Sequence, residues 1–204
     1  MSSVIIGGDI SGSCTLQAPA VSGSSVLTLP VATDTLVGKA TTDTLTNKSI
    51  AATQLTGTIA AARLPAGSVI QVVQGSYATP TSNSTTTAAS TGLTASITPA
   101  SISNKILVIV NVSSIQNNNN GNGVNLSLYR NSTGLYTFGT VNGYTNSAIV
   151  TVTSGGGTTR LDSPATTSAT SYTVYFASNT GSGQVVTVQA NNTESTITLM
   201  EIQG

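Results

Sequence analysis

The chain has 204 residues, and 38% of them are hydrophobic, which is enough to bury a core and excludes disorder of the chain as a whole. Only 6% are charged, and six basic residues balance six acidic ones, so the chain offers neither a basic field for nucleic acid nor an acidic tail. Ser, Thr, Asn and Gln must therefore supply the polar surface, and with Val and Gly they favour strands and turns over helices.

Short imperfect repeats occupy the first third of the chain, from residue 11 to about residue 67. The sequence SGSCTLQAP at residues 11–19 recurs as SGSSVLTLP at residues 22–30, with an offset of eleven residues throughout. A second pair follows, TDTLVGK at residues 33–39 and TDTLTNK at residues 42–48. These units alternate a few apolar and polar residues with Gly or Pro, which is typical of very short strands joined by turns.

Such short strands have no partner to bury against within their own chain. Three identical chains wound about a common axis would bury the repeated leucines together, as the core of a trimeric, interwoven shaft. The predicted shaft core is Leu16, Leu27, Leu36 and Leu45. The alternative is an extended arm that lies over another subunit. Alanine clusters between residues 50 and 67 predict a turn or two of helix, ended by Pro65, as a linker. We therefore predict an N-terminal anchoring and trimerising region at residues 1–67.

From residue 68 onward, strand-like segments are separated by Gly, Asn and Ser clusters. The run at residues 106–110 is apolar throughout, which predicts a strand buried on both faces. About eight strands of this kind predict an all-β sandwich head at residues 68–204, with the eight-stranded jelly roll as the preferred form. The expected strands lie around residues 69–73, 93–98, 106–110, 124–128, 149–152, 172–176, 185–188 and 197–200.

The residues that usually carry catalysis are scarce. There is no histidine, which excludes Ser-His-Asp and Cys-His arrangements within the chain, and the single Cys14 excludes an intramolecular disulfide. A carboxylate pair such as Asp162 with Glu194 stays open, although nothing singles it out. Arg160 and Asp162 are expected on one side of a strand or turn, as an exposed ion pair. We predict no catalytic residue, no metal site and no cofactor, and hence no enzyme.

The polar loop NNNNGNG at residues 117–123 is one candidate for recognition, because loops on a rigid scaffold carry binding. A solvated hairpin loop without a binding role is the alternative. The candidate receptor-contact residues are Asn117, Asn118, Asn119, Asn120 and Asn122.

A local group of aromatic residues is the second candidate, in a chain with only 4% aromatics. Tyrosine rings can stack on the apolar faces of sugars, and Tyr136 and Tyr144 are the candidate saccharide-stacking rings. The alternative is that the group packs within strands, as most aromatic residues do. The group consists of Tyr129, Tyr136, Phe138 and Tyr144.

Three segments resemble a known protein family. TDTLTNKSI at residues 42–50 closely resembles the TLTNKTI signature of phage tail-fibre and related virion proteins, and LTGTIAAARLP at residues 55–65 resembles the segment that often follows it. TITLMEI at residues 196–202 is similar to the closing strand of many fibre C-terminal knobs. The resemblance implies a homotrimer with an interwoven shaft and a β-sandwich head. Residues 1–10 leave little room for a large tail-anchoring domain, so a short N-terminal peptide docked between capsid subunits is an alternative attachment.

Together these features predict a phage virion structural protein, a trimeric fibre or spike whose head mediates adhesion to the host surface. The expected partners are two further copies of the chain, other tail or capsid proteins bound through the N-terminus, and a host-surface polysaccharide or protein. A capsid decoration protein that stabilises the shell is the alternative. No secretory signal or membrane-length apolar run is visible, which disfavours a bacterial surface adhesin and membrane insertion. The scarcity of carboxylates disfavours a polysaccharide depolymerase.

Overall fold

The computed structural model describes residues 3–7, 11–17, 49–51, 53, 56–57, 59–117, 119–146, 151–181 and 183–204. The chain forms two compact units, Met1–Thr56 and Gly57–Gly204. The sequence predicts the boundary at residue 67, whereas residues 57–67 lie in the second unit, the head. Two hydrogen bonds join the end of this segment to the end of the chain: the Gly67 N–H donates to the Gln203 carbonyl, and the Gln203 N–H donates to the Ser68 carbonyl.

An antiparallel hairpin lies in the first unit, formed by β1 (Ser3–Gly7) and β2 (Ser13–Gln17). Val4, Ile5 and Ile6 of β1 are all exposed. Successive side chains of a strand point to opposite faces, so both faces of this hairpin present apolar side chains to solvent. An isolated two-stranded hairpin is at best marginally stable in water, and this one has apolar surface on both sides that a partner could cover.

The predicted shaft core falls largely outside the described residues. Leu16 lies in β2, opposite Val4, while Leu27, Leu36 and Leu45 lie in a part of the chain that the structure does not describe. The interwoven shaft therefore stays a prediction.

The linker contains the short helical turn that its alanines predict. It is a single 3₁₀ turn at Ala61–Arg63, and Leu64 already has an extended backbone (φ −81°, ψ 146°). Pro65 explains this ending, because the proline ring disfavours the helical conformation of the residue before it.

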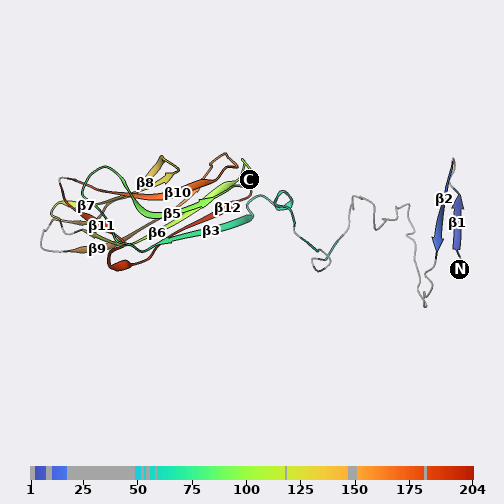
Figure 1. The fold of residues 1–204 in the computed structure, drawn as a ribbon, viewed down its shortest axis with the longest axis horizontal. Helices are drawn as coiled ribbons and strands as arrows, with labels where there is room; N and C mark the ends of the chain where they lie inside the picture. Colours follow the sequence, from blue (N-terminus) through green and yellow to red (C-terminus); the bar gives the residue numbers. More distant parts are fainter. Residues whose placement is uncertain are drawn as a thin grey trace. The chain divides into compact units, whose positions relative to one another are not determined.

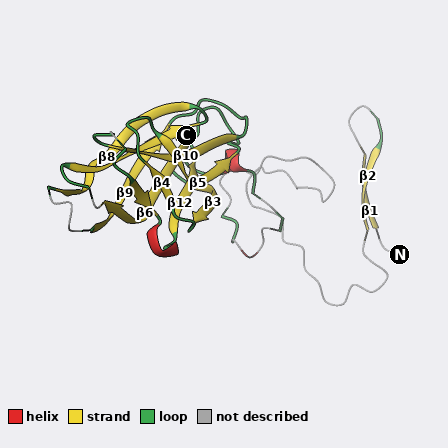
Figure 2. Ribbon diagram, turned by 60° about the vertical axis from the view of Figure 1, so that its left-hand side comes forward, coloured by secondary structure: helices red, strands yellow, loops and turns green. Residues whose placement is uncertain are grey.

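The strands of the head form two antiparallel sheets arranged as two layers (Figures 1 and 2). One sheet has the order β5-β10-β7-β8. The other has β3, β12 and β6 as successive neighbours, and β9 also pairs with β6. The bounds are β3 (Val69–Tyr77), β4 (Thr81–Asn83), β5 (Ala89–Ile97), β6 (Lys105–Asn117), β7 (Asn122–Arg130), β8 (Thr133–Thr145), β9 (Val152–Asp162), β10 (Thr170–Ser178), β11 (Val186–Val188) and β12 (Ser195–Ile202).

The eight long strands pair as four antiparallel couples: β3 with β12, β5 with β10, β6 with β9, and β7 with β8. Along the chain these are the first long strand with the last, the second with the seventh, the third with the sixth and the fourth with the fifth. This nested pairing is that of a jelly roll. The predicted all-β sandwich is confirmed, and its strand order agrees with the preferred form. The short β4 and β11 pair with each other, and β11 also pairs with the end of β6.

A single apolar core lies between the two sheets. In β12, for example, Ile197 and Leu199 are fully buried while the alternating Thr196, Thr198 and Met200 are only partly buried, the period-two pattern of a strand with one face inward. The core comprises Leu93, Ala95, Ile97, Ile106, Val108, Val110, Val112, Ile115, Val124, Leu126, Leu128, Tyr172, Val174, Phe176, Val186, Val188, Ile197 and Leu199.

One sequence prediction about the core is wrong. The apolar run at residues 106–110 is not buried on both faces: Ile106, Val108 and Val110 are buried, but Ile109 is 37% exposed and Leu107 only half-buried. The reason is architectural, because each sheet of a two-layer sandwich has just one face against the core. The outward apolar residues of β6 therefore need a separate explanation.

Glu201 is a fully buried carboxylate at the end of the last strand. It accepts hydrogen bonds of 2.6 Å each from the side-chain amides of Gln71 and Asn104 and from the Ala100 N–H. Burial opposes ionisation, but these hydrogen bonds and one from the Ser101 backbone outweigh it, so the pKa of Glu201 lies below its ordinary value. The carboxylate thus links β3, β12 and the connection between β5 and β6.

The Glu201→Gln substitution tests this role. Its amide group would face the donors that the carboxylate accepts from, so we expect a loss of roughly 2–3 kcal/mol in the free energy of unfolding at pH 7. Because the folded pKa is lowered, the unfolded chain takes up a proton first as the pH falls below about 4.3, and the wild type loses stability from there down through the folded pKa. The Glu201→Gln chain has no carboxylate at this position, so its free energy of unfolding should fall less over this pH range. Urea unfolding at several pH values measures both effects, with the exposed Glu194→Gln as control; equal profiles for all three chains would contradict the assignment.

Candidate functional site

Of the described carboxylates, Asp162 is held by structural partners. Its Oδ2 atom accepts a hydrogen bond of 2.8 Å from Arg130 and one of 2.6 Å from the Tyr172 hydroxyl. Burial raises the pKa of Tyr172, and the bond to Asp162 raises it further, so the hydroxyl stays a donor at neutral pH. Since Asp162 lies in β9 and its partners lie in β7 and β10, the cluster joins the two sheets.

The predicted ion pair between Arg160 and Asp162 is wrong. The Asp162 carboxylate pairs with Arg130 instead, and the Arg160 guanidinium lies 4.6 Å from the centre of the Tyr136 ring. The Tyr136 hydroxyl is also engaged, in a hydrogen bond with Thr158. With its ring under Arg160 and its hydroxyl bonded, Tyr136 packs between strands rather than offering a free ring to a sugar.

The polar loop between β6 and β7 is held mainly by its own asparagines. Asn117 and Asn122 are buried. The Asn117 amide donates to the Asn122 carbonyl at 2.8 Å, and the Asn122 side chain donates to Ser178 and accepts from the Thr180 N–H. These two residues have no surface for a receptor, so their predicted contact role is corrected to a structural one.

The other asparagines of this loop stay candidates for receptor contact. Asn120 is exposed and Asn119 half-buried, whereas Asn118 lies outside the described residues. Tyr144, the other predicted stacking residue, is exposed. It follows Gly143, whose carbonyl accepts a hydrogen bond from Asn117, so ring and loop belong to the same end of the sandwich. Asn119, Asn120 and Tyr144 form what we call the loop end.

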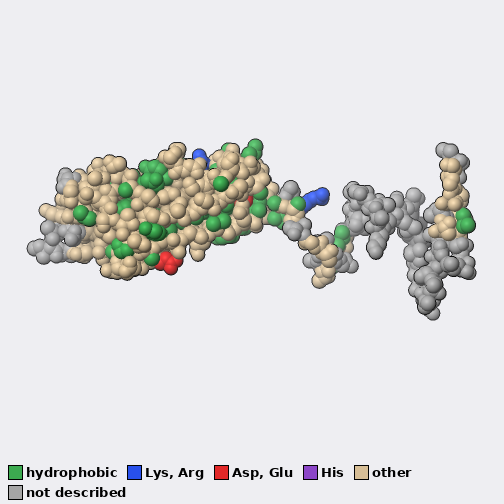
Figure 3. All heavy atoms as spheres, viewed as in Figure 1, with side chains coloured by type: hydrophobic (Ala, Val, Ile, Leu, Met, Phe, Trp, Pro, Cys, Tyr) green, Lys and Arg blue, Asp and Glu red, His purple; other side chains and the backbone are tan. Residues whose placement is uncertain are grey.

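A second surface is the outward face of the sheet β5-β10-β7-β8, and it carries hydroxyls and rings in register. Thr94, Thr173, Tyr129 and Gly134 form one row across the four strands. Ser90, Tyr175, Ser127 and Thr137 form the neighbouring row. None of these eight residues is charged, and the view of the head in Figure 3 is likewise dominated by uncharged atoms. We call these two rows the tyrosine face.

Tyr129 is the central ring of the tyrosine face. It stacks on Tyr175 with ring centroids 4.0 Å apart and 28° between the ring planes. Opposite it on β8 stands Gly134, where an added Cβ would lie 3.3 Å from the ring. Because glycine has no side chain, the Tyr129 ring can lie close over the backbone of β8.

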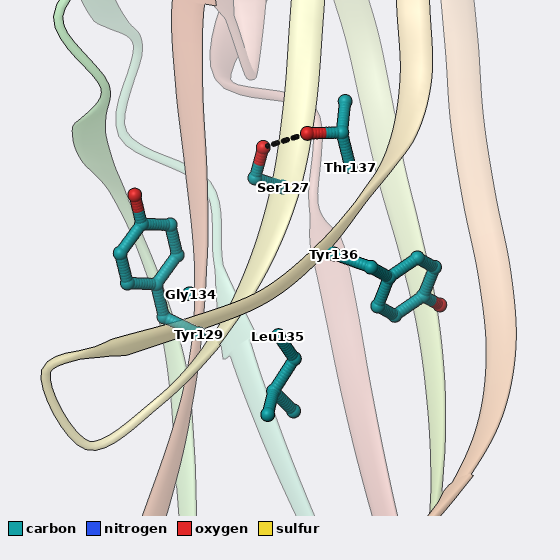
Figure 4. A pocket seen from close by; sticks show the side chains of 6 residues that line it. All are labelled: Ser127, Tyr129, Gly134, Leu135, Tyr136 and Thr137. Atoms are coloured by element: carbon teal, nitrogen blue, oxygen red, sulfur yellow. Dashed lines mark hydrogen bonds between the residues drawn. The ribbon is translucent and has the colours of Figure 1, made fainter.

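An open pocket of about 190 Å³ lies beside the Tyr129 ring. It is lined by Ser127, Tyr129, Gly134, Leu135, Tyr136 and Thr137, and Figure 4 shows the rings of Tyr129 and Tyr136 pointing away from each other. The Ser127 and Thr137 hydroxyls hydrogen-bond to each other at 3.0 Å beside it. The pocket thus combines an aromatic ring with hydroxyl groups that both donate and accept, a combination suited to neutral polar ligands such as sugars.

The sequence names Tyr129 within its aromatic group but misses the partnership with Tyr175. That contact depends on the register of β7 and β10, which are 40 or more residues apart in the chain. Within the described ranges, no group of three or more His, Cys, Asp or Glu side chains could hold a metal ion. None of the described helices is long and apolar enough to cross a membrane.

Comparison with known proteins identifies no family. No protein-family model matches the chain, and neither does any curated protein. Among solved structures, the chain is similar to the VP2 subviral particle of infectious bursal disease virus, with 14% sequence identity and a TM-score of 0.38. The match covers 66% of this chain and 38% of the VP2 chain.

The structural role of the loop asparagines predicts a contrast between two substitutions. Asn122→Ala leaves the Thr180 N–H and the Ser178 hydroxyl without their buried partner, so we expect a loss of roughly 2–3 kcal/mol in the free energy of unfolding. Asn120→Ala removes an exposed side chain and should change stability by less than about 0.5 kcal/mol. Thermal or urea unfolding of both variants checks this; a loss no larger for Asn122→Ala than for Asn120→Ala would contradict the structural assignment.

Proposed function

We propose that the protein is a structural component of a bacteriophage particle, a trimeric fibre or spike whose head attaches the particle to the host surface. The N-terminal region, with its repeats and exposed apolar hairpin, trimerises and binds other tail or capsid proteins. The head presents the tyrosine face to an uncharged host-surface ligand, a polysaccharide being the class that suits its chemistry.

The observation that carries the adhesive role is the open pocket beside the Tyr129 ring, which the Ser127 and Thr137 residues line with their hydroxyls. A ring provides apolar contact for the C–H face of a sugar, and hydroxyls exchange hydrogen bonds with sugar hydroxyls. Many weak contacts of this kind suit a multivalent particle, because linked copies bind with far higher avidity than one copy. The segments that resemble phage fibre proteins, residues 42–50 and 55–65, support the virion part of the proposal.

Single substitutions distinguish the tyrosine face from the loop end. Tyr129→Ala removes the stacking ring, so binding of the purified protein to host cells should fall by roughly tenfold or more, as expected for loss of about 1–2 kcal/mol of stacking per site multiplied over several sites. Tyr144→Ala, at the loop end, should bind as the wild type does. Cell-binding isotherms of the three proteins measure this. If Tyr144→Ala loses binding and Tyr129→Ala keeps it, the adhesive surface is the loop end.

The position of the protein on the particle tests the proposal as a whole. Gold-labelled antibody against residues 68–204 on intact particles should mark the tail if host attachment is the primary role. Label spread over the capsid would favour the decoration protein, and particles lacking the protein should then burst more easily. Absence of label from every particle would overturn the virion assignment.

A further inference from the structure

The outward face of the sheet β3-β12-β6-β9 carries a complete row of apolar residues. Val72, Met200, Leu107 and Leu161 are successive partners in register, one from each strand. With strands about 4.8 Å apart, the row is about 14 Å long. Ile109 lies next to it on β6 and faces the same way. We call these five residues the apolar stripe.

Much of the apolar stripe is exposed to solvent rather than packed within the head. Val72 is 56% exposed, Leu161 50% and Ile109 37%, while Met200 and Leu107 are half-buried by their neighbours. Scattered apolar residues are normal on a protein surface, but a contiguous row marks an interaction site. On one side the next row is mainly polar, and its Gln74 and Thr198 hydrogen-bond to each other at 3.1 Å. On the other side Val69, which is 51% exposed, and Ile202 continue the apolar surface as far as Lys105. The corresponding rows of the other sheet are the polar tyrosine face.

The stripe lies near the end of the sheet at which the chain enters the head. Val72 is five residues beyond Gly67, whose N–H bonds to Gln203, and Met200 is three residues before Gln203. Chains held together by their N-terminal regions would therefore bring this end of their heads together first. Such tethering gives effective concentrations on the order of millimolar.

The absence of charge on and around the apolar stripe suits a second copy of the chain as its partner. Its members and the bordering Gln74, Thr198 and Thr159 are uncharged, so a partner needs no complementary charge. Lys105, which is exposed two residues before Leu107 on the same face, marks the limit of the neutral area. A second copy of the chain presents the same neutral, apolar row and has a net charge of zero, so copies do not repel one another.

The exposed hairpin of Val4, Ile5 and Ile6 is an independent sign of self-association, because its apolar side chains point to both faces. We infer that the apolar stripe is the surface through which the heads of neighbouring copies pack against one another. This inference rests on the proposed trimeric fibre and names the head-to-head contact within it. It assigns the two outward faces of one sandwich to different occupants, copies of the chain on one and the host on the other.

Oxidation of Met200 by hydrogen peroxide in the full-length protein tests the inference, because a thioether buried between copies reacts slowly. Leu161→Glu places a like charge in the stripe of every copy, and Met200 should then oxidise roughly tenfold faster than in the wild type. Val72→Glu, on the opposite edge strand, should have the same effect by an independent route. Ile102→Glu is the matched control, since Ile102 is 67% exposed and lies outside the stripe, and it should leave the rate unchanged. Circular dichroism confirms that each variant is folded.

Light scattering on the same samples separates this inference from the proposed function. A trimer with a slowly oxidised Met200 that both stripe variants expose supports head packing. A trimer in which Met200 reacts equally fast in all four proteins would overturn the inference and leave the shaft intact. A monomer would overturn both the inference and the trimeric fibre, whatever the oxidation rate.

Discussion

The head depends on one constraint: eight long strands of a nearly uncharged chain must share a single core, and each sheet can turn only one face toward it. The nested couples, from β3 with β12 to β7 with β8, satisfy this constraint. Each of the first four long strands along the chain pairs with one of the last four. The buried Asp162 then joins the layers through Arg130 and Tyr172. Everything the sandwich offers to partners lies on its two outward faces and its loops.

Those outward faces differ in chemistry although they belong to one domain. Hydroxyls and two stacked tyrosines form the tyrosine face, and aliphatic side chains with Met200 form the apolar stripe. With charge absent from both, neither face can attract a partner over distance, and short-range contact must supply the selectivity. A sugar-like ligand suits the first face, where two rings lie among hydroxyls. Another copy of the chain suits the second, where burying apolar surface is the available gain.

Sequence patterns predicted the sandwich well because β5, β10 and β12 alternate inward and outward residues cleanly. They missed β8, whose pairing with β7 has several register irregularities that break the alternation. They also missed most of β9, where Gly155–Gly157 looks like a loop. A Cβ on Gly156 would lie 2.5 Å from a terminal methyl of Leu126, so a side chain there would displace that methyl. The predicted strand start at residues 149–150 lies outside the described residues. Neither the tyrosine face nor the apolar stripe was predictable, since both depend on cross-strand register between distant segments.

The central claim is that one outward face contacts copies of the chain and the other contacts the host. Its most direct test places a bulky maleimide-linked polymer on either face, at Thr137→Cys on β8 or Thr159→Cys on β9, in a Cys14→Ser background. Both threonines are exposed on strands at the edge of their sheet. Oligomer mass and binding to host cells are then measured on each labelled protein. Polymer at position 137 should abolish cell binding and leave the mass unchanged, and polymer at position 159 should reduce the mass or loosen the oligomer. Equal effects of the two labels on both properties would contradict the account.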